Sequence, residues 1–192
     1  MSMLTVVENV SLDGVAQAPG GAEEDTRGGF AHGGWARRYD DAVLGAKMGE
    51  GMARPGAMLF GRRTFEQFAG FWPHQKDNPF TPVLNSCRKY VATRTGGEQP
   101  AWQNSELLVG EAADTVAALK KESGQDLSVI GSAELVRGLF AAELVDRLQL
   151  IIHPLVLGSG TRLFPTAGPT AALRLLECTP TTTGSLIALY AV

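Results

Sequence analysis

Val129-Ile130-Gly131-Ser132-Ala133-Glu134-Leu135 carries the strongest signal for a particular architecture in this sequence. It begins as a short apolar run, turns at two small residues and continues with the apolar spacing of a helix. A tight strand-to-helix turn leaves the first backbone N–H groups of the helix without partners inside the helix. Such groups attract anions, and phosphate in particular. The stretch therefore predicts a buried strand, followed by a helix whose start can bind an anion.

A second stretch of the same kind lies upstream, at Met58-Leu59-Phe60-Gly61-Arg62-Arg63-Thr64-Phe65-Glu66. Gly61 allows the backbone to approach a ligand, and the N–H groups of Arg63 and Thr64 would open the next helix. Arg62 adds a guanidinium fork that suits a phosphate. Two such turns favour a dinucleotide as the ligand. The alternative is an ordinary turn with two solvated arginines.

The composition excludes several classes of protein. The chain has 192 residues, of which 44% are hydrophobic and 19% charged, as expected for one globular domain over residues 1–192. The net charge of −3 and the scattered basic residues argue against nucleic acid as a partner. We find no signal-peptide pattern, and no apolar run approaches the roughly 20 residues of a membrane span. Cys87 and Cys178 lack metal-ligand spacing, so we expect buried or half-buried thiols, no metal site and a cytoplasmic location.

Strands and helices alternate through most of the chain, which predicts an α/β fold with a mainly parallel sheet. Strands are expected at 4–10, 57–60, 89–93, 106–109, 127–130 and 148–153, and helices at 39–52, 63–71, 111–123 and 133–141. Residues 73–82 are expected to form a loop, with a helical turn at 85–88. The last two strands, 174–179 and 185–192, are expected to pair antiparallel at the edge of the sheet.

A long glycine-rich stretch separates the first strand from the first helix. Residues 18–34 contain six glycines and one proline, so we expect an irregular loop. Loops of this length in compact domains are usually functional or mobile. We therefore expect the loop to close over a binding site as a lid.

Five short motifs, taken in order, resemble those of dihydrofolate reductase-like proteins. They occupy residues 11–14 (SLDG), 61–66 (GRRTFE), 92–95 (ATRT), 130–135 (IGSAEL) and 144–148 (LVDRL). The tail at 154–164 (PLVLGSGTRLF) is most similar to the reductase domain of the bifunctional riboflavin biosynthesis protein and its stand-alone relatives. The resemblance covers nearly the whole chain. It implies a three-layer α/β/α sandwich with a mostly parallel central sheet and an antiparallel C-terminal edge, NADPH as cofactor, and a homodimer.

The resemblance also implies which residues bind the cofactor. They are Gly61, Arg62, Arg63, Thr64, Thr93, Arg94, Gly131, Ser132, Ala133 and Glu134. Thr93 and Arg94 are expected beside the 2′-phosphate, and a polar strand end is the alternative. Dihydrofolate reductases generally carry Gly-Gly where this chain has Gly131-Ser132. Ser132 has a Cβ, so the same strained backbone costs more, and its hydroxyl is expected to cap the following helix.

Four residues are candidates for the substrate side. Asp13 follows the first strand, where the resemblance implies a border with nicotinamide and substrate. Its carboxylate would orient a substrate group, or relay a proton if its pKa were raised, and Asp-Gly is equally a common turn pair. Trp35 and Trp72 would stack on a planar heterocycle, or belong to the core or lid. Thr161 would meet a substrate phosphate, or lie in an exposed turn.

These observations predict an NADPH-dependent oxidoreductase that transfers a hydride to a C=N or C=O group of a small heterocyclic substrate. A riboflavin-pathway ribosylaminopyrimidine phosphate reductase is one alternative. A non-catalytic nucleotide-binding module of the same fold is another. Dihydrofolate reductase activity is disfavoured because the Gly-Gly pair is missing.

Overall fold

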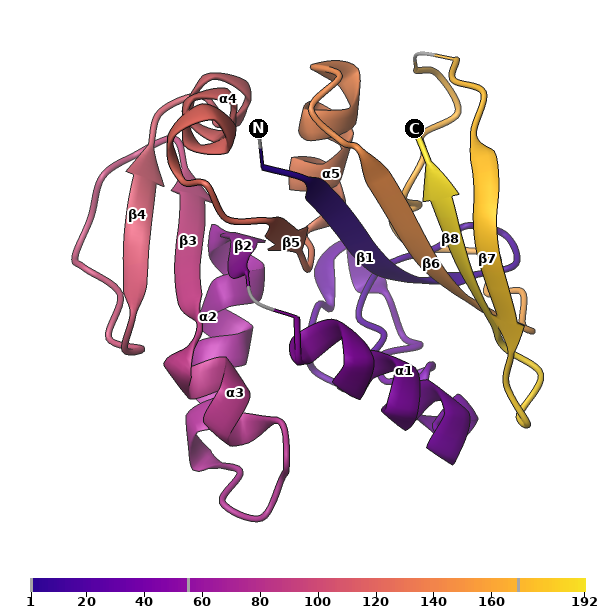
Figure 1. The fold of residues 1–192 in the computed structure, drawn as a ribbon. Helices are drawn as coiled ribbons and strands as arrows, with labels where there is room; N and C mark the ends of the chain where they lie inside the picture. Colours follow the sequence, from indigo (N-terminus) through magenta and orange to yellow (C-terminus); the bar gives the residue numbers. More distant parts are fainter. Residues whose placement is uncertain (1, 55, 169) are drawn as a thin grey trace. The chain divides into compact units, whose positions relative to one another are not determined.

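The computed structural model describes residues 2–54, 56–168 and 170–192 (Figure 1). The chain forms two compact units. The first comprises Met1–Val6 and Gly49–Asp146, and the second comprises Val7–Met48 and Arg147–Val192. The chain first passes from one unit to the other within strand β1 (Leu4–Ser11). The prediction that residues 1–192 form a single domain stays a prediction.

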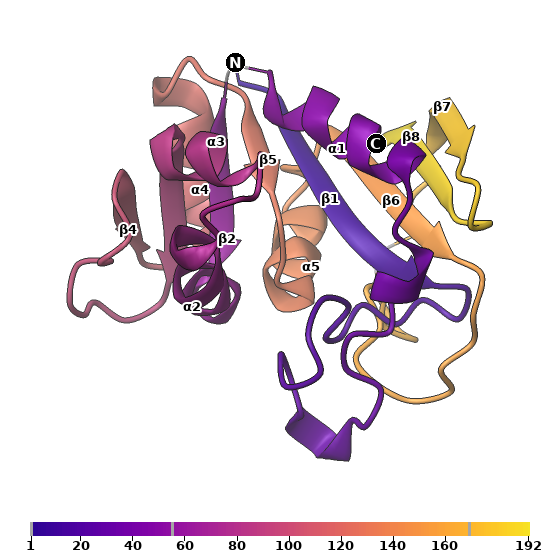
Figure 2. The ribbon, with the colours of Figure 1, turned by 90° about the horizontal axis from the view of Figure 1, so that it is seen from below.

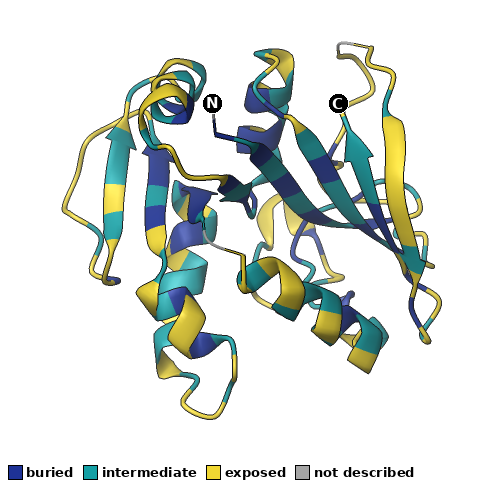
Figure 3. Ribbon diagram, in the orientation of Figure 1, coloured by how far each residue is buried: buried dark blue, intermediate teal, exposed yellow. Residues whose placement is uncertain are grey.

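The first unit is built on a parallel sheet. Its strands, in spatial order, are β4 (Ser105–Val109), β3 (Arg88–Thr93), β2 (Ala57–Gly61), β5 (Leu127–Val129) and the first residues of β1. Every residue of β2 is buried, as Figure 3 shows, which is typical of a central parallel strand. The helices of this unit are α2 (Arg62–Phe71), α3 (Thr81–Ser86), α4 (Ala112–Glu122) and α5 (Ala133–Ala141).

The core of the first unit is an aromatic cluster between β2 and α2. The rings of Phe60 and Phe65 are 6.0 Å apart, and those of Phe60 and Phe68 are 5.3 Å apart. Phe65 and Phe68 are three residues apart and therefore lie on one face of α2. Trp102 joins the cluster and donates its indole N–H to the Oδ1 atom of Asn85 at 2.7 Å. This packing fixes where α2 begins after β2.

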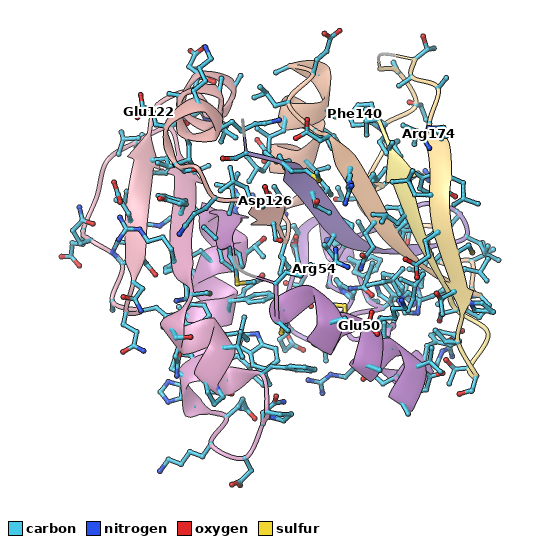
Figure 4. All side chains as sticks on the ribbon, in the orientation of Figure 1. Glu50, Arg54, Glu122, Asp126, Phe140 and Arg174 are labelled. Atoms are coloured by element: carbon cyan, nitrogen blue, oxygen red, sulfur yellow. The ribbon has the colours of Figure 1, made fainter. Side chains whose placement is uncertain are left out.

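The amino ends of β2 and β5 are tied together at Asp126, which Figure 4 labels. Its carbonyl oxygen accepts the N–H of Ala57, and its Oδ1 atom accepts the N–H of Met3, both at 2.9 Å. These bonds align the strands at one end. The turns into α2 and α5 therefore leave the sheet from the opposite, carboxyl end.

Two predicted boundaries were wrong. The expected loop at 73–82 contains a 3-10 helix, Trp72–His74, and the start of α3 at Thr81. Pro82 does not prevent α3, because the first turn of a helix does not need that N–H group. The helix expected from residue 39 begins only at Ala42 (α1, Ala42–Met52). The Oδ1 atom of Asp41 accepts the N–H of Leu44 at 2.8 Å, so Asp41 caps the helix instead of lying inside it.

The second unit contains the predicted antiparallel strands. Strand β8 (Leu186–Ala191) lies between β6 (Arg147–His153) and β7 (Arg174–Pro180), and both pairs are antiparallel. Beside the strands, the chain after β1 runs along the chain after β6, as Figure 2 shows in purple and orange. The N–H of Leu12 donates to the carbonyl oxygen of Leu155, and that of Ala16 to Thr161. No helix of the described residues is long and apolar enough to cross a membrane.

Candidate functional site

The two strand-to-helix turns of the first unit adjoin each other. Strands β2 and β5 are parallel neighbours, with Leu59 paired to Val129, so their chains turn at the same edge of the sheet. The N–H of Gly61 donates to the carbonyl oxygen of Gly131 at 3.2 Å. A Cβ atom on Gly61 would lie only 2.9 Å from the Oγ atom of Ser132. The two turns that were predicted to bind one ligand at two points are therefore close together.

Gly131 is required by its own backbone and by its neighbour. Its φ angle is +62°, which favours glycine, and the Gly131–Ser132 peptide bond is cis. A Cβ atom on Gly131 would lie 3.0 Å from the Oγ1 atom of Thr64 and 3.2 Å from its Cγ2 atom. Thr64 thus lies directly against the second turn. Side chains at positions 61 and 131 would fill the space that these glycines leave between the turns.

The prediction that the Ser132 hydroxyl caps α5 was wrong. Ser132 is the N-cap residue by position, with φ −86° and ψ 161°, but its side chain makes no capping hydrogen bond. The hydroxyl lies beside Gly61, as the 2.9 Å separation shows. Gly61, the N-cap residue of α2, has no side chain to offer. Both helices therefore begin without side-chain caps, which leaves their first N–H groups available to an anion.

Two arginines at this edge of the sheet are held by carboxylates. The Nε atom of Arg62 lies 2.6 Å from the Oε1 atom of Glu66, one helical turn away. The Nη2 atom of Arg94 lies 3.8 Å from the Oε1 atom of Glu134 in the first turn of α5. All four side chains are at least 39% exposed. Exposed pairs contribute only about 0–1 kcal/mol, so a phosphate can replace either carboxylate.

Thr93 ends β3 in a local hydrogen bond. Its hydroxyl donates to the carbonyl oxygen of Thr95 at 2.8 Å. This contact shapes the loop that follows, where a Cβ atom on Gly97 would lie 3.6 Å from the Nη1 atom of Arg62. The loop after β3 and the start of α2 are therefore neighbours. Glu66 and Gly97 belong to this site although neither was predicted as a site residue. The i, i+4 spacing of Arg62 and Glu66 was a signal for the ion pair.

In the second unit, Asp13 binds the loop that follows β6. Its carboxylate accepts the Ser11 hydroxyl at 2.6 Å and the N–H groups of Leu157 and Gly158 at 3.1 and 2.9 Å. The hydrogen bond from Ser11 is the main cause of a pKa lowered to about 2. The carboxylate is therefore ionised at neutral pH. A proton relay by Asp13 required a raised pKa, and the pKa is lowered instead. The alternative, that Asp13 forms the turn, is therefore favoured.

Trp35 is a core residue of the second unit. Its indole N–H donates to the carbonyl oxygen of Gln17 at 2.7 Å, and only 6% of the residue is exposed. It lies in an apolar cluster with Val15, Ala18, Phe30 and Ala36, against which Leu155 and Leu157 also pack. The core alternative is favoured over stacking on a substrate. Ala18 and Phe30 thus anchor residues 18–34 in an apolar cluster whose other members lie outside this range, and the closure of these residues as a lid stays a prediction.

Trp72 and Thr161 lie in different surroundings. Trp72 is half-buried at the end of α2, in contact with Phe68 and Phe71 in the first unit. Thr161 is exposed in the second unit and lines a cavity of about 380 Å³. Its N–H donates to the Oε1 atom of Gln17 at 2.8 Å, and the cavity also contains Arg27 and Ser159. Neither position tests the predicted contact with substrate.

A buried polar network surrounds His153 and was not predicted from the sequence. The residue is 1% exposed and does not present a base to solvent. Its Nε2 atom lies 2.8 Å from the Oδ1 atom of Asn9, and its Nδ1 atom lies 3.0 Å from the Oγ atom of Ser185. Nε2 donates to the amide oxygen and Nδ1 accepts the hydroxyl, which suits a neutral ring. Burial lowers the pKa of His153 to about 4.

No group of three or more His, Cys, Asp or Glu side chains could hold a metal ion within the part of the chain that the structure describes. The candidate site is built from backbone N–H groups, hydroxyls and arginines. Its parts in the first unit, at residues 61–64, 93–94 and 131–134, suit an anionic ligand with several phosphates.

Comparison with known proteins identifies the family. Residues 2–187 match the model of the RibD C-terminal domain, and the chain belongs to this family. An uncharacterized Bacillus subtilis protein, YyaP, is 33% identical over 114 residues, which are 56% of this chain and 58% of that protein. The chain thus spans little more than half the length of this curated relative.

Two solved structures share the fold. One is a Thermotoga maritima diaminohydroxyphosphoribosylaminopyrimidine deaminase/5-amino-6-(5-phosphoribosylamino)uracil reductase, 12% identical, with a TM-score of 0.66 over 99% of this chain and 56% of that one. The other is dihydrofolate reductase from Enterococcus faecalis complexed with NADP(H), 16% identical, with a TM-score of 0.60 over 98% and 95% of the two chains. The predicted dihydrofolate reductase-like α/β/α fold, with its mostly parallel sheet and antiparallel C-terminal edge, is confirmed.

Proposed function

We propose that this member of the RibD C-terminal domain family is an NADPH-dependent reductase acting on a C=N or C=O group of a small heterocyclic compound. The family supports a reductase of the riboflavin-pathway type. The contact between the two strand-to-helix turns, at Gly61 and Gly131, is the observation that supports NADPH as the cofactor. Two uncapped helix starts side by side offer two anion sites, which suits the phosphates of a dinucleotide.

The residues present fit the phosphates of NADPH. Gly61 and Gly131 leave a cradle that a Cβ atom would fill, and the N–H groups of Arg63, Thr64, Ala133 and Glu134 lie in the first turns of α2 and α5. The Thr64 and Ser132 hydroxyls supply further donors beside the cradle. When bound, NADPH would supply the hydride, and the chain would position the cofactor and its substrate.

Arg62 and Arg94 would set the preference for NADPH over NADH. Each arginine is held near the cradle by a carboxylate, Glu66 or Glu134, and each is accessible to solvent. The 2′-phosphate of NADPH carries more charge than a carboxylate and accepts a bidentate guanidinium. The phosphate would therefore displace the carboxylate. Thr93 is the last residue of β3, directly before Arg94, and would contribute a hydroxyl.

Asp13 and Thr161 in the second unit, and separately Trp72 in the first unit, stay candidates for orienting a substrate. Asp13 is ionised at neutral pH, so the proton that completes the reduction would come from water. Membership of the RibD C-terminal domain family favours a ribosylaminopyrimidine phosphate as the alternative to another small heterocyclic substrate. A cytoplasmic location also stays a prediction.

Cofactor binding by the Arg62→Ala variant tests the proposal. We expect the parent chain to bind NADPH at least tenfold more tightly than NADH, because a charge-assisted contact contributes about 1.5–3 kcal/mol. Arg62→Ala should lose most of this preference. Arg88→Ala is the matched control, because Arg88 begins β3 at the opposite end of the strand from Arg94 and pairs with Glu106. A parent chain that binds neither nucleotide, measured by fluorescence titration, would overturn the proposal.

A non-catalytic nucleotide-binding module is the second candidate function. Oxidation of NADPH, followed at 340 nm with a panel of heterocyclic imines and carbonyl compounds that includes the ribosylaminopyrimidine phosphate, distinguishes the two. Tight NADPH binding without turnover of any acceptor would favour the module. Turnover that Arg62→Ala weakens with NADPH but not with NADH would favour the reductase.

A further inference from the structure

The second unit contains a cavity of about 380 Å³, near the lower end of the range of about 300–1,000 Å³ for small-molecule sites. Its wall is formed by Gln17, residues 27–30 and residues 159–161. These residues come from the chain after β1 and the chain after β6, which run side by side in Figure 2. The cavity has room for one small heterocycle, so the hydrogen-bonding groups in its wall determine the class of compound that it takes.

Arg27, the charged residue among those in this wall, is firmly paired with Asp25. Its Nε atom donates to the Oδ1 atom of Asp25 at 2.8 Å, its Nη2 atom donates to the Oδ2 atom, and its backbone N–H donates to Oδ1 at 3.1 Å. The hydrogen bond from Arg27 lowers the pKa of Asp25, so this carboxylate is ionised at neutral pH. The Arg27 guanidinium therefore already holds an anion, and that anion belongs to the protein.

This ion pair is less open to exchange than the pairs beside the cofactor cradle. The Asp25 side chain is 19% exposed, whereas the side chains of Glu66 and Glu134 are 56% and 71% exposed. A carboxylate that loses its partner while largely buried is costly, and one that turns into water is not. A phosphate would therefore displace Glu66 or Glu134 far more readily than Asp25.

Backbone N–H groups in the wall are also engaged within the protein. Those of Gly29, Phe30 and Thr161 donate to protein oxygen atoms at 2.8 to 3.4 Å. Directly before residue 159, two N–H groups of the loop after β6 donate to the carboxylate of Asp13. A phosphate site needs several N–H groups that point at the ligand. In this wall such donors bind the protein itself.

The charges around the cavity are negative on balance. Residues 13–34 and 154–164 contain four carboxylates and two arginines, a net charge of −2 with His32 neutral. The second arginine, Arg162, is also beside a carboxylate, because its Nη2 atom lies 3.7 Å from the Oδ2 atom of Asp13. These segments would repel a phosphate monoester, which carries a charge of about −1.5 to −2 at neutral pH.

The wall offers neutral groups to a ligand. The hydroxyls of Ser159 and Thr161 stand at exposed positions, and a hydroxyl can donate or accept, so it matches an amino or a carbonyl group. Between them, Gly160 lies so close to Phe30 that a Cβ atom on Gly160 would be 2.6 Å from the Cε2 atom of the ring. The wall at this point consists of hydroxyls, backbone and an aromatic ring, which suits an uncharged polar ring compound.

We propose that this cavity takes the substrate of the reductase, and that it selects a nitrogen heterocycle with amino or carbonyl groups and without a phosphate. The role of the cavity as a substrate site rests on the proposed function, and its selectivity distinguishes the two substrate classes named there. The ribosylaminopyrimidine phosphate is disfavoured, because its phosphate would leave water for a wall whose cation and N–H donors are already paired. Thr161 then meets the substrate through its hydroxyl.

A matched pair of ligands tests this selectivity. They are the ribosylaminopyrimidine phosphate and the same compound after removal of its phosphate, with a diaminopyrimidine and a pterin as further unphosphorylated probes. Isothermal titration calorimetry of the full chain, with and without saturating NADPH, measures each dissociation constant. We expect the best unphosphorylated compound to bind at least about tenfold more tightly than the phosphate. Equal or tighter binding of the phosphate, or no binding of any unphosphorylated compound, would overturn the proposal.

Asp25→Asn tests the cause of the selectivity. It removes the charge that pairs with Arg27, so affinity for the phosphate compound should rise about tenfold, and affinity for the unphosphorylated compound should stay within about threefold. Glu106→Gln is the matched control, because it releases Arg88 in the first unit and should change neither affinity. Circular dichroism verifies the fold of both variants. A folded Asp25→Asn chain with the parent preference would contradict the role of the Arg27–Asp25 pair.

Ser159→Phe tests whether the cavity is the site. A phenyl group at this exposed position would fill the cavity, so affinity for the unphosphorylated compound should fall at least about tenfold. Ser86→Phe, at an exposed position of the first unit, is the control and should bind as the parent does. Unchanged affinity in a folded Ser159→Phe chain would place the ligand elsewhere and refute the proposal.

NADPH titration of the same chains separates this proposal from the proposed function. A parent chain that binds the unphosphorylated compound in the cavity but does not bind NADPH would refute the reductase and leave the selectivity of the cavity intact. A parent chain that binds NADPH and prefers the phosphate compound would refute the selectivity alone. Ser159→Phe should keep its NADPH affinity within about twofold of the parent value, because residues 61–64 and 131–134 belong to the other unit.

Discussion

The strand-to-helix turns of the first unit and the long loops of the second unit are organised in different ways. The turns at Gly61 and Gly131 adjoin because two neighbouring parallel strands end together, and the residues that matter lie within a few positions of each strand. The loops are held by contacts between residues about 145 positions apart, such as those of Asp13 with Leu157 and Gly158. Local patterns therefore predict a turn, but they do not predict which residues fix a loop.

The largest effect on NADPH binding is expected at Gly131, where the two strand-to-helix turns of the first unit pack most closely. Gly131→Val would place a branched side chain where a single Cβ atom already lies 3.0 Å from the Oγ1 atom of Thr64, at a φ of +62°. We expect NADPH affinity to fall by about 100-fold, as for two lost phosphate contacts. Isothermal titration calorimetry measures the change. Gly138→Ala, at a helix position with open space around it, is the control and should bind as the parent does.

The second effect concerns the buried histidine of the other region. The folded pKa of His153 is about 4, below its ordinary value of 6.5, so between these pH values only the unfolded chain binds the proton. Stability is therefore complete above pH 6.5 and falls by up to about 3 kcal/mol as the pH drops to 4. Urea unfolding at pH 7.5 and 4.5 measures the loss. His153→Gln should be less stable at pH 7.5 and should lack most of this slope, and an equal slope in both chains would contradict the assignment.

A smaller effect is expected from the carboxylates beside the arginines. Glu66→Gln removes the negative charge next to Arg62 and leaves the guanidinium free for the 2′-phosphate. We expect NADPH affinity to rise about twofold to fivefold and NADH affinity to stay the same, because an exposed pair contributes about 0–1 kcal/mol. Glu134→Gln should act in the same direction through Arg94. Equal gains for both nucleotides would show that the arginines do not read the 2′-phosphate.

The smallest effect on the cofactor is expected at Asp13. Asp13→Asn removes a charge that accepts two backbone N–H groups of the loop after β6, so the loops should become more sensitive to protease. NADPH affinity should stay within about twofold of the parent value, a difference below 0.5 kcal/mol. If turnover also keeps its pH profile between pH 6 and 9, Asp13 is not a proton relay. If the variant instead loses its activity above some pH between 6 and 9 where the parent chain stays active, Asp13 does relay a proton.

Much of the first unit could be predicted from the sequence, because its signals are local. The apolar run before Gly61 and the helical spacing after it predicted β2, α2 and their turn. The same reasoning predicted α5 at Ala133–Ala141 but placed the Ser132 hydroxyl wrongly, because its position depends on the neighbouring strand end at Gly61. Sequence spacing carries no information on such cross-strand contacts.

The second unit was harder for the same reason. The antiparallel pairing of β7 and β8 followed from two apolar segments joined by a short polar connection. The burial of Trp35 and the bonds of His153 to Asn9 and Ser185 could not be predicted, because their partners come from distant parts of the chain. Asp13 was assigned chemistry from its place after a strand, whereas its pKa is set by the Ser11 hydroxyl and the loop after β6.

The side chain of Gln17 has a consequence for anyone who exchanges loops between members of this family. Its Nε2 atom donates to the carbonyl oxygens of Asp25 and Arg27, while its Oε1 atom accepts the N–H of Thr161. One amide therefore uses both of its ends to join two segments that are far apart in the gene. A graft of residues 18–34 alone would move the glycine-rich loop without Gln17, whose hydrogen bonds hold it to the segment around Thr161. A chimera that preserves the architecture must transplant Gln17 and the segment around Thr161 together with that loop.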